Sequence, residues 1–360
     1  MFDFLQSWYR RYFTDPQAVL LVVLLVMSFV IIYFMGSMLA PLLAAIVIAY
    51  MLAGSIAQLE RRKMPRMLAV NLVFILFVAF LVFLVVFLLP IVSRQASEFF
   101  QELPRMINNG QVLLLQLPQK YPDIISEDSV RQVITASRTA ITEMGQGILS
   151  ISLASIPAII AVLIYLVLVP LLIFFFLKDK AIVLKWLSGF LPTERRLVTN
   201  LWHEMDAQIG NYIRGKGYEI IIVNLASYMI FKFFGLNYAY LLAIIVGLSV
   251  LIPYIGAAVV TIPVAFVAFF QWGLGSDFTW LMIWYFFLQF LDGNVLVPLL
   301  FSDVVNLHPI AIIAAILVFG GFWGFWGIFF AIPLATLVKA LLNAWPAQVK
   351  STEKLETASV

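Results

Sequence analysis

A small group of polar residues in the C-terminal half of this 360-residue chain could do chemistry inside a membrane. Asp292 stands between Gln289 and Asn294 in an otherwise apolar run over 279–301. A carboxylate near the middle of a membrane span costs roughly 3 kcal/mol on insertion scales, so it usually faces a cavity, a proton or an ion. Gln289 and Asn294 add hydrogen-bond donors and acceptors, and Gly293 would let a second backbone approach. The group predicts an ion or solute site; a carboxylate satisfied by helix-end amide groups is the purely structural alternative.

Two further ionisable residues follow where this run ends. Asp303 and His308 are candidates for coupling an ion to transport, and a polar residue at the membrane interface is the alternative for His308. The two histidines of the chain are far apart and there is no cysteine, so we predict no metal site and no cofactor. The chain also lacks a Gly-x-Ser-x-Gly elbow and a nucleotide-binding loop. We therefore predict that it is not an enzyme, and that any transport is secondary or passive.

Two interrupted apolar segments, Tyr238–Gln271 and Pro309–Leu342, flank the Asp292 run, and each is 34 residues long. One helix of that length would span roughly 50 Å, whereas the hydrocarbon core is roughly 30 Å thick and two full spans need about 40 residues. We therefore predict two re-entrant helical hairpins. Irregular backbone at membrane depth is tolerated only where protein buries it or water lines it. The residues at the tips are thus candidates for the substrate pathway: Pro253 and Gly256 in the first hairpin, and Gly320, Gly321 and Gly324 in the second.

The two segments also resemble each other, which predicts an internal repeat. Three matches have offsets of 69, 68 and 70 residues: Asn237 with Asn306, Ala243 with Ala311, and Pro263 with Pro333. Chance recurrence in an apolar chain is the alternative. Each repeat would be a spanning helix followed by a hairpin, over 217–271 and 278–342, with opposite orientations in the membrane. Such inverted repeats place broken helices at a shared midplane site, so both tips are expected close to Asp292.

The composition indicates an integral helical membrane protein. Apolar residues make up 63% of the chain, the mean hydropathy is +1.03, and only 11% of residues are charged. We predict an all-α polytopic fold with about six full spans plus the two hairpins. A tight turn at Gly36 and Pro41 would separate the first two spans. The net charge of +3 gives no reason to expect nucleic acid as a partner. The predicted spans are 18–35, 42–59, 68–92, 156–177, 217–234 and 279–301.

The distribution of charge between the spans predicts the orientation in the membrane. Region 178–216 has seven basic and four acidic residues, whereas region 93–155 has five basic and six acidic residues. Because cytoplasmic loops carry an excess of Lys and Arg, we place 178–216 and both termini in the cytoplasm and 93–155 outside.

The chain order then suggests a domain division. We expect N-terminal spans over 1–92, an extracytoplasmic helical insert over 93–155, a fourth span with a cytoplasmic amphipathic helix over 156–216, a transport core over 217–345 and a disordered tail over 346–360. The insert should hold helices near 94–117 and 127–149. It could gate an exit path, or it could pack in an oligomer.

Long runs of this sequence are similar to the autoinducer-2 exporter family of bacterial inner-membrane proteins, over about residues 1–346. The resemblance implies a polytopic transporter and a homo-oligomer, for which a pentamer is one assembly state. It implies export of the signal autoinducer-2, or exchange of Na⁺ for H⁺. The family's carboxylate position matches Asp292, where other branches often carry Glu. The runs that carry the resemblance are Trp8–Tyr12, Asn211–Lys216, Leu251–Ala257, Leu291–Pro298, Val305–Pro309 and Gly320–Gly327.

We therefore expect a multi-pass secondary transporter of the bacterial inner membrane that moves a small polar molecule or signal such as autoinducer-2. Two alternatives stay open. One is a sodium/proton-type cation antiporter that works through Asp292. The other is a membrane scaffold that transports nothing.

Overall fold

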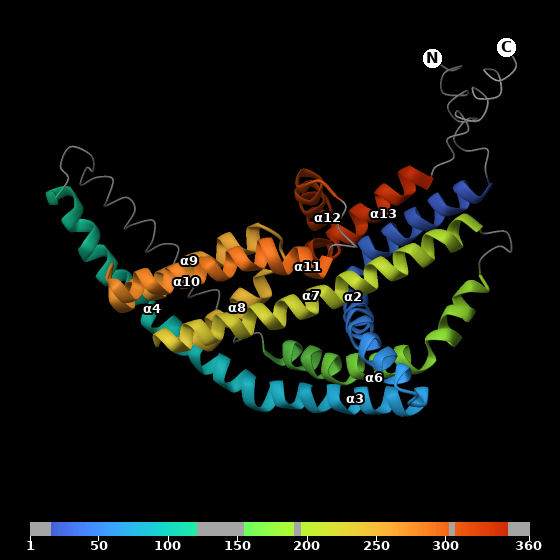
Figure 1. Cartoon of the computed structure of the whole chain (residues 1–360), viewed down its shortest axis with the longest axis horizontal. Coiled ribbons are helices and arrows are strands. Elements are labelled where there is room, and N and C mark those ends of the chain that lie inside the picture. The colour runs from blue at the N-terminus through green and yellow to red at the C-terminus, as the bar shows by residue number, and fades with distance from the viewer. Residues whose placement is uncertain (1–15, 121–154, 191–195, 302–306, 345–360) are drawn as a thin grey trace, which may run out of the picture. The chain divides into compact units, whose positions relative to one another are not determined.

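The computed structural model describes residues 16–120, 155–190, 196–301 and 307–344, and this part of the chain consists of helices and short connections, without a strand (Figure 1). The prediction of an all-α fold is confirmed. The helices are α2 Pro16–Arg61, α3 Arg66–Phe83, the π-helix η1 Leu84–Leu88, α4 Leu89–Lys120, α6 Ser155–Ser188, α7 Arg196–Phe234, α8 Ala239–Ser249, α9 Ile255–Trp272, α10 Ser276–Leu291, the π-helix η2 Asp292–Leu296, α11 Val297–Phe301, α12 Pro309–Phe329 and α13 Ala331–Ala344.

Six helical stretches in the described residues are long and apolar enough to cross a membrane. Four of them correspond to predicted full spans, at 42–59, 68–92, 217–234 and 279–301, and the other two are arms of the predicted hairpins; the predicted span 156–177 lies within α6, which is not among the six. The predicted first span, 18–35, corresponds to a shorter apolar helix, Val22–Gly36. The six stretches are Met38–Arg61, Arg66–Gln111, Leu201–Phe234, Ile255–Trp272, Ser276–Phe301 and Pro309–Phe329.

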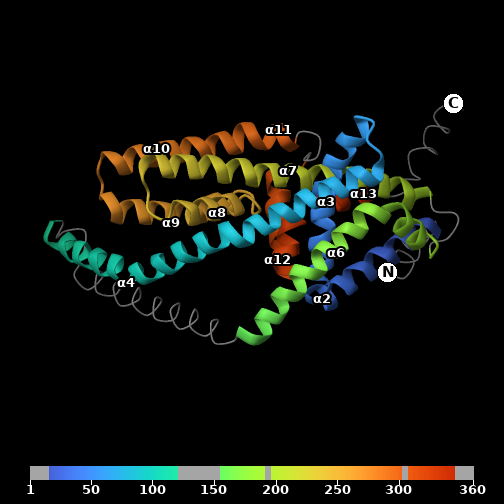
Figure 2. The same cartoon turned by 90° about the horizontal axis from the view of Figure 1, so that it is seen from below.

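Several helices continue where the sequence pattern predicted a break. The predicted tight turn at Gly36 and Pro41 is wrong, because α2 is helical through both residues. A proline inside a helix removes one hydrogen bond and bends the helix without ending it, and α2 changes direction along its length in Figures 1 and 2.

The third predicted span and the first part of the predicted insert, 93–120, also form one helical run. It comprises α3, η1 and α4 and passes from residue 66 to residue 120 without a loop. The predicted helix at 94–117 is confirmed within α4. The predicted helix at 127–149 and the tail over 346–360 lie outside the described residues.

The chain divides into two compact units. Unit 1 comprises 1–58, 175–217 and 297–360, and unit 2 comprises 59–174 and 218–296. In unit 2, α9 packs against α8 and α10, and α8 also contacts α4 (Figure 2). The core of unit 2 is apolar: Val223 and Phe231 from α7, Leu242 and Val246 from α8, Val260, Val264 and Val267 from α9, and Leu281 and Tyr285 from α10 are buried.

Unit 1 contains the second hairpin and the amphipathic first half of α7. Leu201 and Met205 of α7 are buried against Leu25 of α2 and Leu337 of α13, whereas Trp202 is half exposed. The predicted amphipathic helix is therefore confirmed, and it is continuous with the span that follows it.

Candidate transport site

The first hairpin reverses direction at residues 249–256. α8 ends at Ser249, and α9 begins at Ile255 after a turn that contains Pro253. Tyr254 has φ 63° and ψ −50°, outside the helical region. A Cβ at Gly256 would lie 1.8 Å from the carbonyl oxygen of Ser249, so the two arms approach so closely that only glycine fits.

The second hairpin, inside α12, also turns at a residue with positive φ and brings a glycine close to the backbone of the other arm. Gly324 has φ 56° and ψ −130°, which interrupts the helix. A Cβ at Gly327 would lie 1.8 Å from the carbonyl oxygen of Phe319. In a straight helix, residues eight positions apart are about 12 Å apart along the axis, so the chain must fold back between them. The predicted interruption at Gly320–Gly324 is confirmed, and Gly320 lies in the closely packed arm, with its Cβ position 2.8 Å from Ile328 Cγ1.

The tips of the two hairpins share three backbone features at offsets close to that of the sequence repeat. The carbonyl residues Ser249 and Phe319 are 70 positions apart, the residues with positive φ, Tyr254 and Gly324, are 70 apart, and the closely packed glycines Gly256 and Gly327 are 71 apart. The sequence matches had offsets of 68 to 70. This agreement of backbone geometry supports an internal repeat over chance recurrence.

Asp292 begins the π-helix η2, which separates α10 from α11. A π-helical turn is wider than an α-helical one and often marks a functional site. Asp292 is half-buried, and Gly293 and Asn294 are exposed. The Asn294 side-chain amide donates to the carbonyl of Phe290, 2.9 Å away, within its own helix. No neighbouring atom of the described residues lies within 4 Å of a Cβ built on Gly293, so the close backbone approach expected there is not seen.

A chain of hydrogen bonds connects the helix of Asp292 to the tip of the first hairpin. Gln289 Nε2 donates to the hydroxyl of Tyr285 at 2.7 Å, and that hydroxyl lies 3.1 Å from Thr261 Oγ1. Thr261 in turn donates to the carbonyl of Ala257 at 2.7 Å, next to Gly256. Because the only hydroxyl hydrogen of Thr261 goes to the carbonyl of Ala257, the Tyr285 hydroxyl donates to Thr261. Gln289 of α10 is thus linked, through Tyr285 and Thr261, to the carbonyl of Ala257 in the first turn of α9.

Tyr285 and Thr261 are candidates that the sequence analysis missed. Tyr285 is fully buried, and it shares one helix face with Gln289 and Asp292, at spacings of four and three residues. That spacing could have drawn attention to Tyr285. The pairing with Thr261 could not be seen, because it depends on which faces of α9 and α10 meet.

Replacing Tyr285 by phenylalanine is expected to destabilise the protein by about 1–3 kcal/mol, since the Gln289 and Thr261 side chains lose a buried partner. The apparent melting temperature of the purified protein measures the effect. Tyr165→Phe, at an exposed tyrosine of α6, is the matched control and should leave the melting temperature unchanged. Equal melting temperatures for the two variants would contradict a hydrogen-bonded link at Tyr285.

Comparison with known proteins decides the family of this chain. The family model described as "AI-2E family transporter" matches residues 22–347. The chain belongs to this transporter family. It is 47% identical to "Putative permease PerM" of Escherichia coli (strain K12) over 346 residues, which cover 96% of this chain and 98% of the relative. It is 26% identical to "Putative transport protein YueF" of Bacillus subtilis (strain 168), over 86% of this chain and 84% of that relative.

The family and the six apolar helices establish a multi-pass membrane transporter that lies in a lipid bilayer. The names of the relatives indicate a permease and not an enzyme. Family membership therefore favours transport over the scaffold alternative.

Of the two predicted coupling residues of the transporter, the structure describes only His308. His308 is exposed and caps α12, because its Nδ1 accepts a hydrogen bond from the Ile310 amide at 3.3 Å, and Pro309 occupies the first turn. This helix-capping contact gives His308 a structural role. Asp303 lies outside the described residues. The distances from Asp292 to the second hairpin stay a prediction.

A second polar cluster of the transporter, in unit 1, also escaped the sequence analysis. Asp206 of α7 accepts a hydrogen bond from Tyr50 of α2 and lies 3.5 Å from the Lys180 ammonium of α6. The same ammonium lies 5.5 Å from the centre of the Tyr50 ring. The cluster connects three helices that are far apart in the sequence. Its residues lie on segments predicted to be cytoplasmic or membrane-spanning, and no local motif indicates their contact.

Proposed function

We propose that this AI-2E family transporter is a secondary transporter of the bacterial inner membrane that moves a small polar solute. The observation that carries the proposal is the repeated hairpin tip, which recurs at an offset of about 70 residues in a membrane transporter. Transporters built from repeats bind their substrates where such broken helices meet. The transport core is proposed to extend over 217–345, with the spans of 1–92 as its frame.

The pathway is proposed to run past both tips and past Asp292. Helix ends at the tips at Gly256 and Gly324 would offer partial charges to a polar solute, because their backbone groups lack partners within the helix. Asp292 would take up and release H⁺ or bind Na⁺. A change in the charge of Asp292 would act on Gln289 and, through Tyr285, on the first tip. The second repeat is proposed to run opposite to the first, so that one hairpin could open to each side of the membrane.

The proposed solute is a small polar signal such as autoinducer-2, and the proposed direction is export. The second candidate is a sodium/proton-type antiporter. It is favoured by one observation, the ionisable Asp292 at a π-helical turn of a spanning helix. Uptake of Na⁺ into inverted vesicles driven by a proton gradient, with and without the solute, separates the two candidates.

The proposed assembly is a homo-oligomer, with a pentamer as the state to test, and both termini are placed in the cytoplasm. The insert over 93–155 is placed outside. Because the chain has no cysteine, introduced cysteines can orient it. Asn108 and Lys63 are exposed and suit external and cytoplasmic labels respectively, whereas Gln111 is buried and does not.

Cysteine accessibility at the tips tests the proposed pathway. Single cysteines at Tyr254 and Gly321 should react with a water-soluble thiol reagent in intact membranes, because a water-lined pathway would reach them. Tyr254 is 59% exposed, and the Cβ position of Gly321 has no neighbour within 4 Å. A cysteine at Phe80, an apolar residue of α3 that is 54% exposed, is the lipid-facing control and should not react. If the tip cysteines reacted no faster than the Phe80 control, the proposal that the pathway passes the tips would be wrong.

A further inference from the structure

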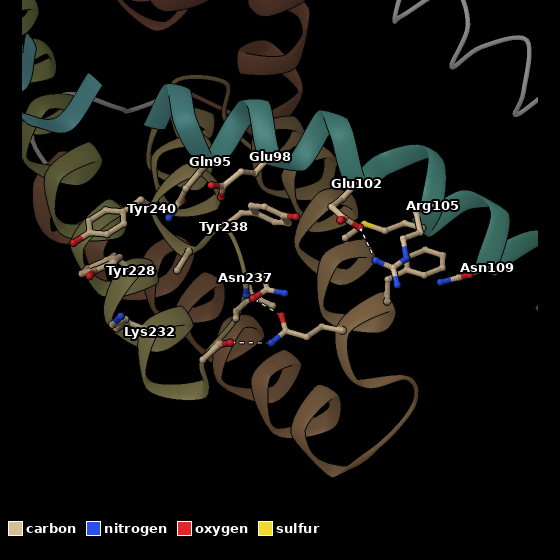
Figure 3. A pocket seen from close by; sticks show the side chains of 16 residues that line it. Gln95, Glu98, Glu102, Arg105, Asn109, Tyr228, Lys232, Asn237, Tyr238 and Tyr240 are labelled. Carbon is tan, nitrogen blue, oxygen red and sulfur yellow. Dashed lines mark hydrogen bonds and ion pairs between the residues drawn. The ribbon is translucent and has the colours of Figure 1, made fainter. Parts of the chain in front are cut away.

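Unit 2 contains a cavity that is separate from Asp292. It has a volume of about 810 Å³ and lies between α4 and the base of the first hairpin (Figure 3). One wall is α4, from Gln95 to Asn109. The other walls are the end of α7, the connection from α7 to α8, and the end of α9 at Phe270 and Gln271. The volume is within the range of roughly 300–1,000 Å³ that is typical of small-molecule sites.

Hydrogen bonds between side chains and backbone fix the walls of this cavity. Gln271 of α9 donates to the carbonyl of Gly235 and accepts from the amide of Asn237, both at 2.8 Å, so it holds the connection from α7 to α8 (Figure 3). Gln95 of α4 accepts a hydrogen bond from the amide of Leu241 at 3.1 Å. The walls are thus held by contacts between helices that are distant in the sequence, and the cavity is preformed.

The cavity is lined by charges of both signs. Two carboxylates, Glu98 and Glu102, come from α4, and two cations, Arg105 and Lys232, come from α4 and from the last turn of α7. Arg105 lies 3.7 Å from Glu102, and Arg94 of α4, which does not line the cavity, lies 2.8 Å from Glu98. In the part of the chain that the structure describes, no acidic group pairs with Lys232. Each carboxylate thus has one arginine beside it and keeps further acceptor positions for a ligand, while Lys232 keeps its donors.

Tyrosine side chains complete the lining. Tyr228 and Tyr240 stack with their ring centres 4.2 Å apart, near Lys232 in Figure 3. Tyr238 lies between Glu98 and Glu102 in the same view. Burial, together with Glu102 and Glu98, raises the pKa of Tyr238 above its ordinary value. Its hydroxyl therefore stays protonated and can donate a hydrogen bond.

We infer that this cavity binds a small zwitterion, a molecule that carries both an ammonium and a carboxylate group. The ammonium group would face Glu98 and Glu102, and the carboxylate would face Lys232. Tyrosine rings attract the cationic end of such a ligand. A ligand with one charge only would use one sign of the lining, and an uncharged polyol would use neither. This site is distinct from the pathway at Asp292 and does not depend on it.

Ligand-detected NMR on the full-length protein in nanodiscs tests the assignment. The probes are glycine, glutamine and the dipeptide glycylglutamine, which are zwitterions of increasing length. We expect saturation transfer to at least one of them, and at least about tenfold weaker binding of its N-acetyl and amide derivatives, each of which lacks one charge. Failure of all three probes to bind, or equal binding of the singly charged derivatives, would overturn the assignment.

Charge-removing variants locate the bound probe. Glu98→Gln and Lys232→Gln should each weaken binding of that probe by at least about tenfold. Glu204→Gln and Lys185→Gln remove the same charges at exposed positions away from the cavity and should leave the affinity unchanged. Cavity variants that bind like these controls would place the probe elsewhere.

The Asp292→Asn variant separates this inference from the proposed transport function. It should bind the probe with unchanged affinity, because Asp292 does not line the cavity. Loss of binding in an Asp292→Asn protein that keeps its melting temperature would overturn the assignment of the ligand to this cavity. Failure of transport alone would not affect it.

Discussion

Replacing Gly256 or Gly327 by alanine is expected to prevent the protein from accumulating in a folded form. The added Cβ would lie 1.8 Å from the carbonyl oxygen of Ser249 or of Phe319, respectively. Both oxygens belong to the backbone, so they cannot rotate away as a flexible side chain could. The tip must open instead, and we expect a loss of more than about 3 kcal/mol in the free energy of unfolding. Fluorescence-detected gel filtration of detergent extracts measures the yield of folded protein, which should fall by at least about tenfold.

Glycines with open surroundings provide the matched controls. A Cβ at Gly293 or Gly321 would meet no atom within 4 Å. Alanine also favours a helix over glycine by up to about 1 kcal/mol, so Gly293→Ala and Gly321→Ala should accumulate at least as well as the unmodified protein. If Gly256→Ala and Gly293→Ala gave the same yield, the close approach at the first tip would not matter for folding.

Replacing Asp292 by asparagine is expected to reduce coupled transport by more than about tenfold while leaving expression close to normal. The side-chain amide of asparagine can neither take up a proton near neutral pH nor supply a charged ligand to Na⁺. Removing the carboxylate also removes its cost of insertion, roughly 3 kcal/mol on insertion scales, so the folded protein should not be lost. Flux into proteoliposomes under an imposed proton or sodium gradient measures the effect, and gel filtration measures the amount of folded protein.

Asp277→Asn is the matched control, because it makes the same chemical change at an exposed position in the first turn of the same helix, α10. It should transport like the unmodified protein. Normal transport by Asp292→Asn across a range of pH would show that Asp292 is structural, and the ion-coupling proposal would then have to be abandoned.

The sequence by itself determined the features that depend on local chemistry. Apolar composition and segment length predicted an all-helical fold with several spans and two hairpins, because backbone polar groups must be hydrogen-bonded across the fixed thickness of the hydrocarbon core. The interruption of 309–342 was predicted by its glycines, and Gly324 does adopt a positive φ. The repeat was visible as offsets near 70 residues, since corresponding turns need corresponding residues.

Helix continuity was not determined in this way. Hydropathy marks where a helix would leave the lipid, but a helix can extend beyond that point when packing supports it. For this reason α2 continues through Pro41 and α7 joins the amphipathic segment to the next span.

The contacts between helices were decided only by the tertiary structure. Tyr285 meets Thr261 because one face of α10 packs on one face of α9, and Asp206 meets Tyr50 across 156 residues of chain. The cavity beside Glu98 needs walls from α4, α7 and α9 at once. A hydrophobic pattern says which face of each helix is buried, but many pairs of helices could bury those faces. Their choice depends on the packing of all the helices together, and this choice assembles the polar sites.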